Sequence, residues 1–208
     1  MLKFATVFAA SLTLSAAAEA VTIFTANLTN AQEPAVTTPT LVGGAPRPVS
    51  FGTATFTLND AQTAMTFTAS VFNIDFTGTQ TTDVNDNLVA AHIHAGPPGT
   101  PTLPVVWGFF GNPFNDNNPN DVVNTPFTSA VGGTISGKWD AGEGNSTTLT
   151  AQLPNIFAGN SYINFHTTQF PGGEIRGQIL AIPEPETYAL MLAGLGALGW
   201  AARWRSSR

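Results

Sequence analysis

The sequence of 208 residues contains no cysteine and few charged side chains. Without cysteine the chain can form no disulfide bond, and thiolate catalysis and cysteine-bound metal sites are excluded. Charged residues make up 10% of the chain, against about 25% in an ordinary soluble domain. Histidine is also scarce, so any site built on imidazoles must use the three histidines of the chain.

Cations are rarest between residues 21 and 182. Ten Asp and Glu residues lie in this segment, and its only cations are Arg47, Lys138 and Arg176. A surface with so few positive charges cannot neutralise the phosphate backbone of a nucleic acid. We therefore expect no nucleic-acid partner.

The same segment lacks any pattern that supports a long helix. Apolar residues instead alternate with polar ones, as in residues 53–58, where Ala54, Phe56 and Leu58 share one face of an extended chain. Similar alternation predicts strands at 21–28, 65–71, 89–94, 105–110, 134–139, 147–153, 162–167 and 174–180. About nine short strands predict an all-β fold, either an antiparallel β-sandwich or a partly closed barrel.

Two segments of this β-rich region repeat each other. Residues 64–74 read AMTFTASVFNI and residues 146–156 read STTLTAQLPNI, with Thr, Thr, Ala, Asn and Ile identical at one fixed offset. Further matches extend the similarity to pseudo-repeats at about 52–111 and 133–180, which predict two similar half-domains. The alternative is chance matching between threonine-rich strands.

The N-terminal residues 1–20 have the features of a secretory signal peptide. Lys3 provides a positive charge, residues 4–14 are mostly apolar, and small residues surround position 20. This order is typical of signal peptides, and we expect cleavage after Ala20 and export through the Sec machinery.

The C-terminal segment 182–208 has three parts. It begins with Pro183, Glu184 and Pro185, continues with an apolar run at 188–202, and ends with a basic cluster of Arg203, Arg205 and Arg208. As a helix the run would span about 22 Å, less than the roughly 30 Å of a bilayer core. We expect a hydrophobic helix that inserts into the inner membrane transiently, with the arginines on the cytoplasmic side.

These three parts, in this order, resemble the PEP-CTERM sorting signal of Gram-negative bacteria. The resemblance implies recognition by an exosortase, removal of the tail, and delivery of the protein to the cell surface or the extracellular matrix. An ordinary membrane anchor is the alternative. The predicted division is thus a signal peptide at 1–20, a β domain at 21–181 and a sorting tail at 182–208.

Several short motifs of the β domain resemble the CHRD domain, a module named from chordin and found in bacterial secreted proteins. They are ANL at 26–28, AQEP at 31–34, AHIHAG at 91–96, NFHT at 164–167 and PGGEIRG at 171–177. The resemblance implies an extracellular β-rich module without a defined activity. We therefore expect a non-enzymatic binding or structural protein without a cofactor, with an extracellular polysaccharide or a matrix protein as its partner.

The histidines offer a second interpretation. His92 and His94 lie two residues apart on a predicted strand, so both side chains point to one face, with Cα atoms about 7 Å apart. His166 would be a third ligand, and the set would suit a mononuclear copper or zinc site in a metal-binding protein or redox enzyme. The alternative is structural: His94 and His166 each precede a Pro-Gly turn, and each imidazole would hydrogen-bond that turn.

Other candidate sites rest on weaker patterns. Glu174 and Arg176 lie on the same side of a predicted strand and would form a buried ion pair. The Asn- and Asp-rich segment 115–121 has enough oxygen ligands for calcium, but not the spacing of a known calcium loop. Trp107 is either a stacking platform for a sugar or part of the core.

Overall fold

Strand pairing dominates the architecture. The computed structural model describes residues 21–101, 104–182, 192–196, 198 and 203. Ten strands of residues 21–182 belong to one sheet, in the order β5-β4-β8-β9-β1-β2-β3-β7-β6, and β10 also pairs with β1. Every pair of named strands is antiparallel. The predicted all-β fold is confirmed.

The elements follow one another closely along the chain. The strands are β1 (Thr22–Thr29), β2 (Phe51–Leu58), β3 (Ala64–Phe72), β4 (Leu88–Ala95), β5 (Val105–Phe110), β6 (Val123–Pro126), β7 (Gly132–Asp140), β8 (Ser161–Thr167), β9 (Ile175–Gln178) and β10 (Leu180–Ala181). The helices are the 3₁₀ turns η1 (Asn30–Gln32) and η2 (Val84–Asp86) and the α-helix α1 (Leu149–Phe157).

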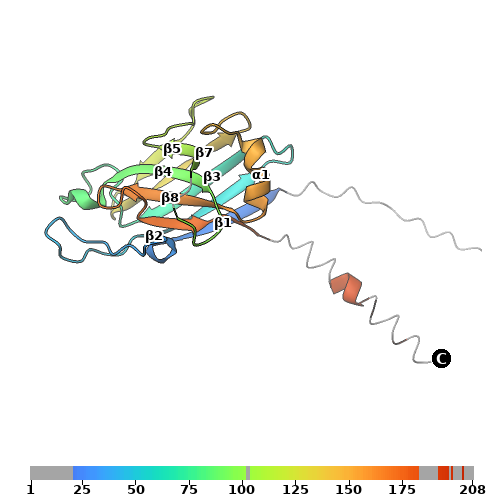
Figure 1. Ribbon diagram of the computed structural model, residues 1–208, viewed down its shortest axis with the longest axis horizontal. Helices are drawn as coiled ribbons and strands as arrows, with labels where there is room; N and C mark the ends of the chain where they lie inside the picture. Colours follow the sequence, from blue (N-terminus) through green and yellow to red (C-terminus); the bar gives the residue numbers. More distant parts are fainter. Residues whose placement is uncertain (1–20, 102–103, 183–191, 197, 199–202, 204–208) are drawn as a thin grey trace, which may run out of the picture.

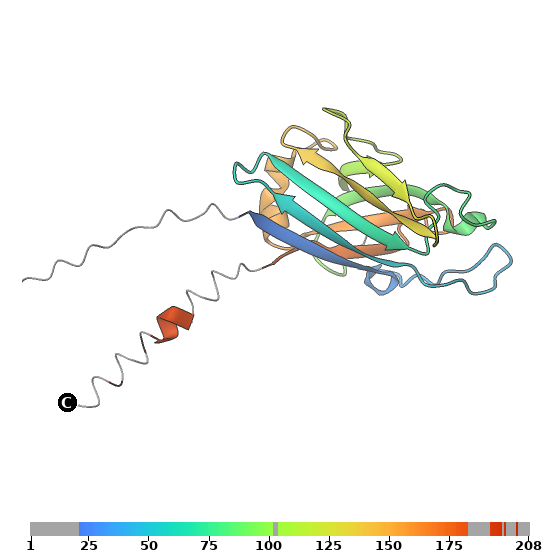
Figure 2. The ribbon, with the colours of Figure 1, turned by 180° about the vertical axis from the view of Figure 1, so that it is seen from behind.

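The sheet is so strongly curled that its two halves face each other (Figures 1 and 2). Aromatic side chains join the halves: the ring of Phe67 on β3 lies 5.5 Å from Trp107 and 4.8 Å from Phe109, both on β5. Trp107 also stacks on Trp139 of β7, with ring centroids 5.4 Å apart. These contacts close the core between the halves. Of the two predicted architectures, the partly closed barrel therefore describes the fold.

Alternation along β2 and β3 produces this core. Ala54, Phe56 and Leu58 are buried on β2 while the threonines between them are more exposed, and β3 shows the same pattern. Phe56 pairs in register with Phe67, and their rings stack with centroids 6.1 Å apart. Because side chains alternate with period 2, the pattern and the register place these apolar groups on the inner face, while Phe51 and Phe72 stack on each other on the outer face.

The strand predicted at 147–153 is wrong, because this segment begins α1. The hydroxyl of Thr148 accepts a hydrogen bond from the backbone N–H of Ala151 and caps the first turn. Three residues at helical spacing, Leu149, Leu153 and Ile156, then face the core. The helix lies at one end of the curled sheet (Figures 1 and 2). The matching segments 64–74 and 146–156 therefore adopt different secondary structures, and the division into half-domains remains a prediction.

The C-terminal tail lies largely outside the described residues, as does the signal peptide at 1–20. Of the sorting residues only Arg203 is described; Pro183, Glu184, Pro185, Arg205 and Arg208 are not. Residues 192–196 are helical. Within the described parts of the chain, no helix has the length and apolar character needed to cross a membrane.

Candidate functional site

Two histidines of β4 lie on the face opposite the hydrophobic core. His92 and His94 are two residues apart and share one face, whereas Ile93 between them is fully buried in the core. Both imidazoles are nevertheless buried, with 4% and 1% of their surface exposed. This face of the sheet is therefore covered, and its polar groups must find partners inside the protein.

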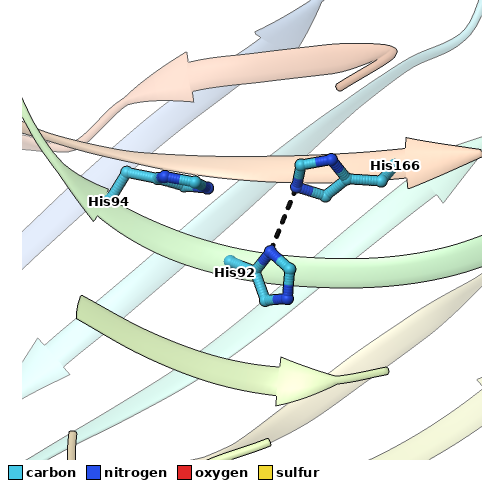
Figure 3. Close-up of side chains that lie close together, drawn as sticks. All are labelled: His92, His94 and His166. Carbon is cyan, nitrogen blue, oxygen red and sulfur yellow. Dashed lines mark hydrogen bonds between the residues drawn. The ribbon is translucent and has the colours of Figure 1, made fainter. Parts of the chain in front are cut away.

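Strand β8 brings the third histidine beside them. It pairs with β4 so that Ala90 lies opposite His166 and Asn164 lies opposite His92. His166 is thus the diagonal neighbour of His92, close enough for side-chain contact. The ligand nitrogens of the three histidines all lie within 4.8 Å of one another, and Figure 3 shows the rings gathered over β4 and β8.

Hydrogen bonds orient two of the rings. The Pro171 carbonyl accepts a bond from His166 Nδ1 at 3.0 Å, which requires the proton of His166 to be on Nδ1. Nε2 of His166 is then an acceptor, and His92 Nδ1, 3.1 Å away, donates to it. The structural role predicted for His166, a bond to the following Pro-Gly turn, is therefore present.

Burial disfavours the charged form of His92 and His166. Desolvation lowers the pKa of His92 to about 3, and the nearby His166 and His94 act in the same direction, while an interaction with the Asn112 backbone opposes the shift. Desolvation also lowers the pKa of His166, opposed by its hydrogen bond to Pro171. The neutral imidazole is the form that binds a metal ion.

A glycine lets the chain close over His92. Gly108 of β5 pairs with His92 across the sheet. A Cβ atom on Gly108 would lie 1.8 Å from the carbonyl oxygen of Pro113 and 3.2 Å from His92 Cδ2. Only a residue without a side chain allows this approach of the loop that follows β5.

Aromatic and cationic groups continue the cluster along β8 and β9. The His94 ring stacks on Tyr162, with centroids 4.8 Å apart and planes at 1°. The guanidinium carbon of Arg176 lies 4.6 Å from the centroid of the Tyr162 ring, within the range of a cation–π contact. Arg176 also donates to the carbonyl of Gln32 at 2.6 Å and to that of Thr100 at 2.9 Å. These bonds fix two covering loops to the sheet.

Next to these groups lies a buried carboxylate that composition and pattern did not single out. Glu33 is 5% exposed, and its Oε1 makes no hydrogen bond to any residue that the structure describes. Burial raises its pKa to about 7, against the opposing charge of Arg176. The amide of Asn164 is fully buried and likewise lacks a partner within the described chain. A Cβ atom on Gly173 would lie within 2.8 Å of both groups.

Two neighbouring hollows open beside Glu33. Their volumes are about 450 and 350 Å³. Glu33, Pro34 and Val36 line both, the first hollow extends to residues 169–173, and the second reaches Arg176 and Gln178. The sequence motifs at 31–34, 91–96 and 171–177, which lie far apart in the chain, therefore meet around the histidines and these hollows.

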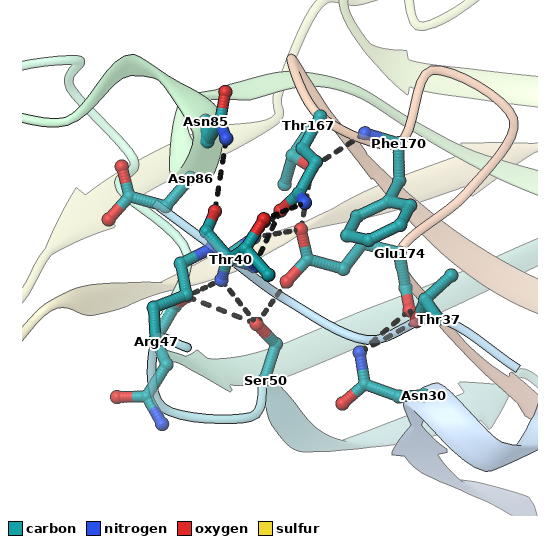
Figure 4. A network of polar contacts seen from close by, with 12 residues as sticks. Asn30, Thr37, Thr40, Arg47, Ser50, Asn85, Asp86, Thr167, Phe170 and Glu174 are labelled. Carbon is teal, nitrogen blue, oxygen red and sulfur yellow. Dashed lines mark hydrogen bonds and ion pairs between the residues drawn. The ribbon is translucent and has the colours of Figure 1, made fainter. Parts of the chain in front are cut away.

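The predicted pair of Glu174 and Arg176 is wrong, because Glu174 pairs with Arg47. Nη2 of Arg47 lies 2.5 Å from Glu174 Oε2, and both side chains are almost completely buried. Ser50 and Thr167 donate further hydrogen bonds to the same carboxylate. The network ties the long connection between β1 and β2 to the start of β9 (Figure 4).

The weaker candidates have structural roles. Asp116 is buried, and its Oδ2 accepts hydrogen bonds from the backbone N–H groups of Asp121 and Val122. Glu143 accepts from the N–H groups of residues 117 and 118. These hydrogen bonds hold the Asn-rich loop in shape, and calcium binding there stays a prediction. Trp107 is fully buried, so it belongs to the core and cannot act as a stacking platform for a sugar.

Comparisons with known proteins agree with the sequence motifs. The CHRD domain family model matches residues 24–179, and the PEP-CTERM protein-sorting motif matches residues 181–206. No curated protein and no solved structure matches the chain. Because the first match covers most of the chain and nearly all of the sheet, the chain belongs to the CHRD domain family and ends in a PEP-CTERM sorting motif.

Proposed function

We propose that this is an exported, non-enzymatic protein of the cell surface or extracellular matrix, which an exosortase releases from its tail and which acts by binding or assembly. The observation that carries the proposal is the position of the sorting motif. The match begins at residue 181, where β10 ends. The two family matches, which end at residue 179 and begin at residue 181, therefore adjoin without overlapping.

Removal of the tail should leave the folded domain intact. The N–H of Ile182 donates to the carbonyl of Ile23 at 2.9 Å, next to the pairing of β10 with β1. The buried core residue closest to the tail is Ile179. Among the described residues, a cut after residue 182 would thus remove no core side chain and no strand. Transient anchoring in the inner membrane followed by release is compatible with this design.

Processing is tested by mass spectrometry of the protein from its bacterial host. We expect the surface or extracellular fraction to contain a product that begins near Val21 and lacks the C-terminal run. Replacing Pro183, Glu184 and Pro185 by alanine should leave the tail attached and the protein in the membrane fraction. Thr187→Ala, which preserves the motif, is the control. A secreted product with its tail intact would refute the sorting proposal.

The binding surface is proposed to be the pair of hollows around Val36. This side chain is 67% exposed although it is apolar, and it lines both hollows. Concave hollows lined by apolar side chains and a few polar groups are typical of ligand sites. The partner would be an extracellular polysaccharide or a matrix protein.

Binding is tested by adding the purified protein to isolated matrix from the host. Val36→Asp should reduce the bound fraction severalfold, whereas Val42→Asp should not, since Val42 is 64% exposed and lines neither hollow. Treating the matrix with a protease or with glycosidases then identifies the class of partner. Equal retention of both variants would exclude the hollows as the binding surface.

A further inference from the structure

We propose that His92, His94 and His166 form a binding site for a single late first-row metal ion, Cu²⁺ or Zn²⁺. This inference goes beyond the surface role and does not depend on it. Three imidazoles lie on two neighbouring strands, and the register of β4 and β8 fixes their positions (Figure 3). Rigid strands hold ligands more accurately than loops do.

The spacing of the nitrogens suits one ion. His92 Nδ1 and His166 Nε2 are 3.1 Å apart. Two nitrogens that each lie 2.0–2.1 Å from a tetrahedral ion are separated by about 3.3 Å, so these two atoms are already at ligand distance. The most distant ligand atoms of the cluster are within 4.8 Å. Completing the site therefore requires the His94 ring to move by about 1 to 2 Å.

The hydrogen bonds prepare the ring nitrogens for coordination. The Pro171 carbonyl holds the proton of His166 on Nδ1 and leaves the lone pair of Nε2 facing His92. A carbonyl behind the ligating imidazole is the usual second partner of a metal-bound histidine. In His92 the proton must shift from Nδ1 to Nε2 when the ion binds. Nε2 of His92 makes no hydrogen bond of good geometry within the described chain and is available to carry that proton.

The composition of the cluster indicates which ions it would take. Three imidazoles form the group, and no carboxylate of the described residues joins them. Calcium and magnesium require oxygen ligands, whereas neutral imidazoles suit copper and zinc. A given nitrogen site generally binds Cu²⁺ more tightly than Zn²⁺. Three protein ligands also leave a coordination position for a water molecule or a substrate.

The test is calorimetric titration of the protein, purified without a histidine tag and treated with a chelator. At pH 7.5 we expect one Cu²⁺ or one Zn²⁺ per chain, with Cu²⁺ bound at least tenfold more tightly, and no binding of Ca²⁺ or Mg²⁺. His92→Gln, His94→Gln and His166→Gln should each weaken binding by about 100-fold. Asp121→Asn, which removes a partly exposed carboxylate outside the cluster, should have no effect.

A spectroscopic measurement on the unmodified protein keeps the test decisive if a histidine variant fails to fold. Electron paramagnetic resonance of the Cu²⁺ form should show coupling to the nitrogens of several imidazoles. Binding weaker than micromolar, a signal from oxygen ligands alone, or unchanged affinity in folded histidine variants would each overturn the metal site. None of these results would affect the sorting and surface role, which are measured without metal.

Discussion

Replacing Glu33 by glutamine is expected to change how the stability of the domain depends on pH. The Glu33 carboxylate is buried beside the two hollows, and its pKa is raised from 4.5 to about 7, mainly by desolvation. Glutamine has nearly the same shape and resembles the protonated acid, but it never becomes charged. The substitution therefore removes the charge and keeps the packing.

The sign follows from linkage between protonation and folding. An acid with a higher pKa in the folded chain binds its proton more tightly when folded, so its contribution is complete below pH 4.5 and is lost as the pH rises to about 7. At 1.36 kcal/mol per pH unit, this pKa difference corresponds to a loss of about 3 kcal/mol. The two hollows beside Glu33 give the charged carboxylate room to turn towards solvent, and we therefore expect a smaller loss of about 2 kcal/mol.

Urea unfolding, followed by tryptophan fluorescence between pH 4 and pH 8.5, measures this effect. The unfolding free energy of Glu33→Gln should equal that of the parent near pH 4 and exceed it by about 2 kcal/mol at pH 8. Taking the difference between the two proteins cancels the titration of the histidines. Asp60→Asn, at an exposed turn, is the matched control and should show no such trend. A difference that is independent of pH, or that grows towards acid, would refute the reasoning.

Three further sets of substitutions test the buried ion pair, the helix cap and the close approach at Gly108. Removing one partner of the buried pair, by Glu174→Ala or Arg47→Met, should lower the unfolding free energy by about 3 to 5 kcal/mol in urea unfolding. The double variant should lose less than the sum of the two single losses, and simple additivity would argue against coupling. Thr148→Ala should cost about 1 kcal/mol in the same assay and Thr148→Ser much less, because only alanine removes the cap hydroxyl. Gly108→Ala should lower the unfolding free energy by about 3 kcal/mol, because the added Cβ clashes with the following loop. Gly142→Ala, with open space at its Cβ, should be nearly neutral. Equal thermal stability of the two variants would contradict the close packing at Gly108.

Local patterns predicted most strands and failed where two patterns coincided. Leu149, Ala151 and Leu153 alternate as in a strand, but Leu149, Leu153 and Ile156 also have helical spacing. The threonine cap and Gly159 in the left-handed conformation just after the helix were signals for the second interpretation. Strand β6 escaped prediction because its four residues, VNTP, show no apolar alternation.

The sequence by itself determined the features that depend on short-range chemistry. The spacing of His92 and His94 places both imidazoles on one face, because side chains alternate along any strand. The residues of the tail motif are likewise contiguous in the chain, so the family model matches them from the sequence alone. Only the tertiary structure brought His166 to His92, buried Glu33, and chose Arg47 as the partner of Glu174. These contacts join segments up to 127 residues apart, so they arise from strand register and curling that no local pattern encodes.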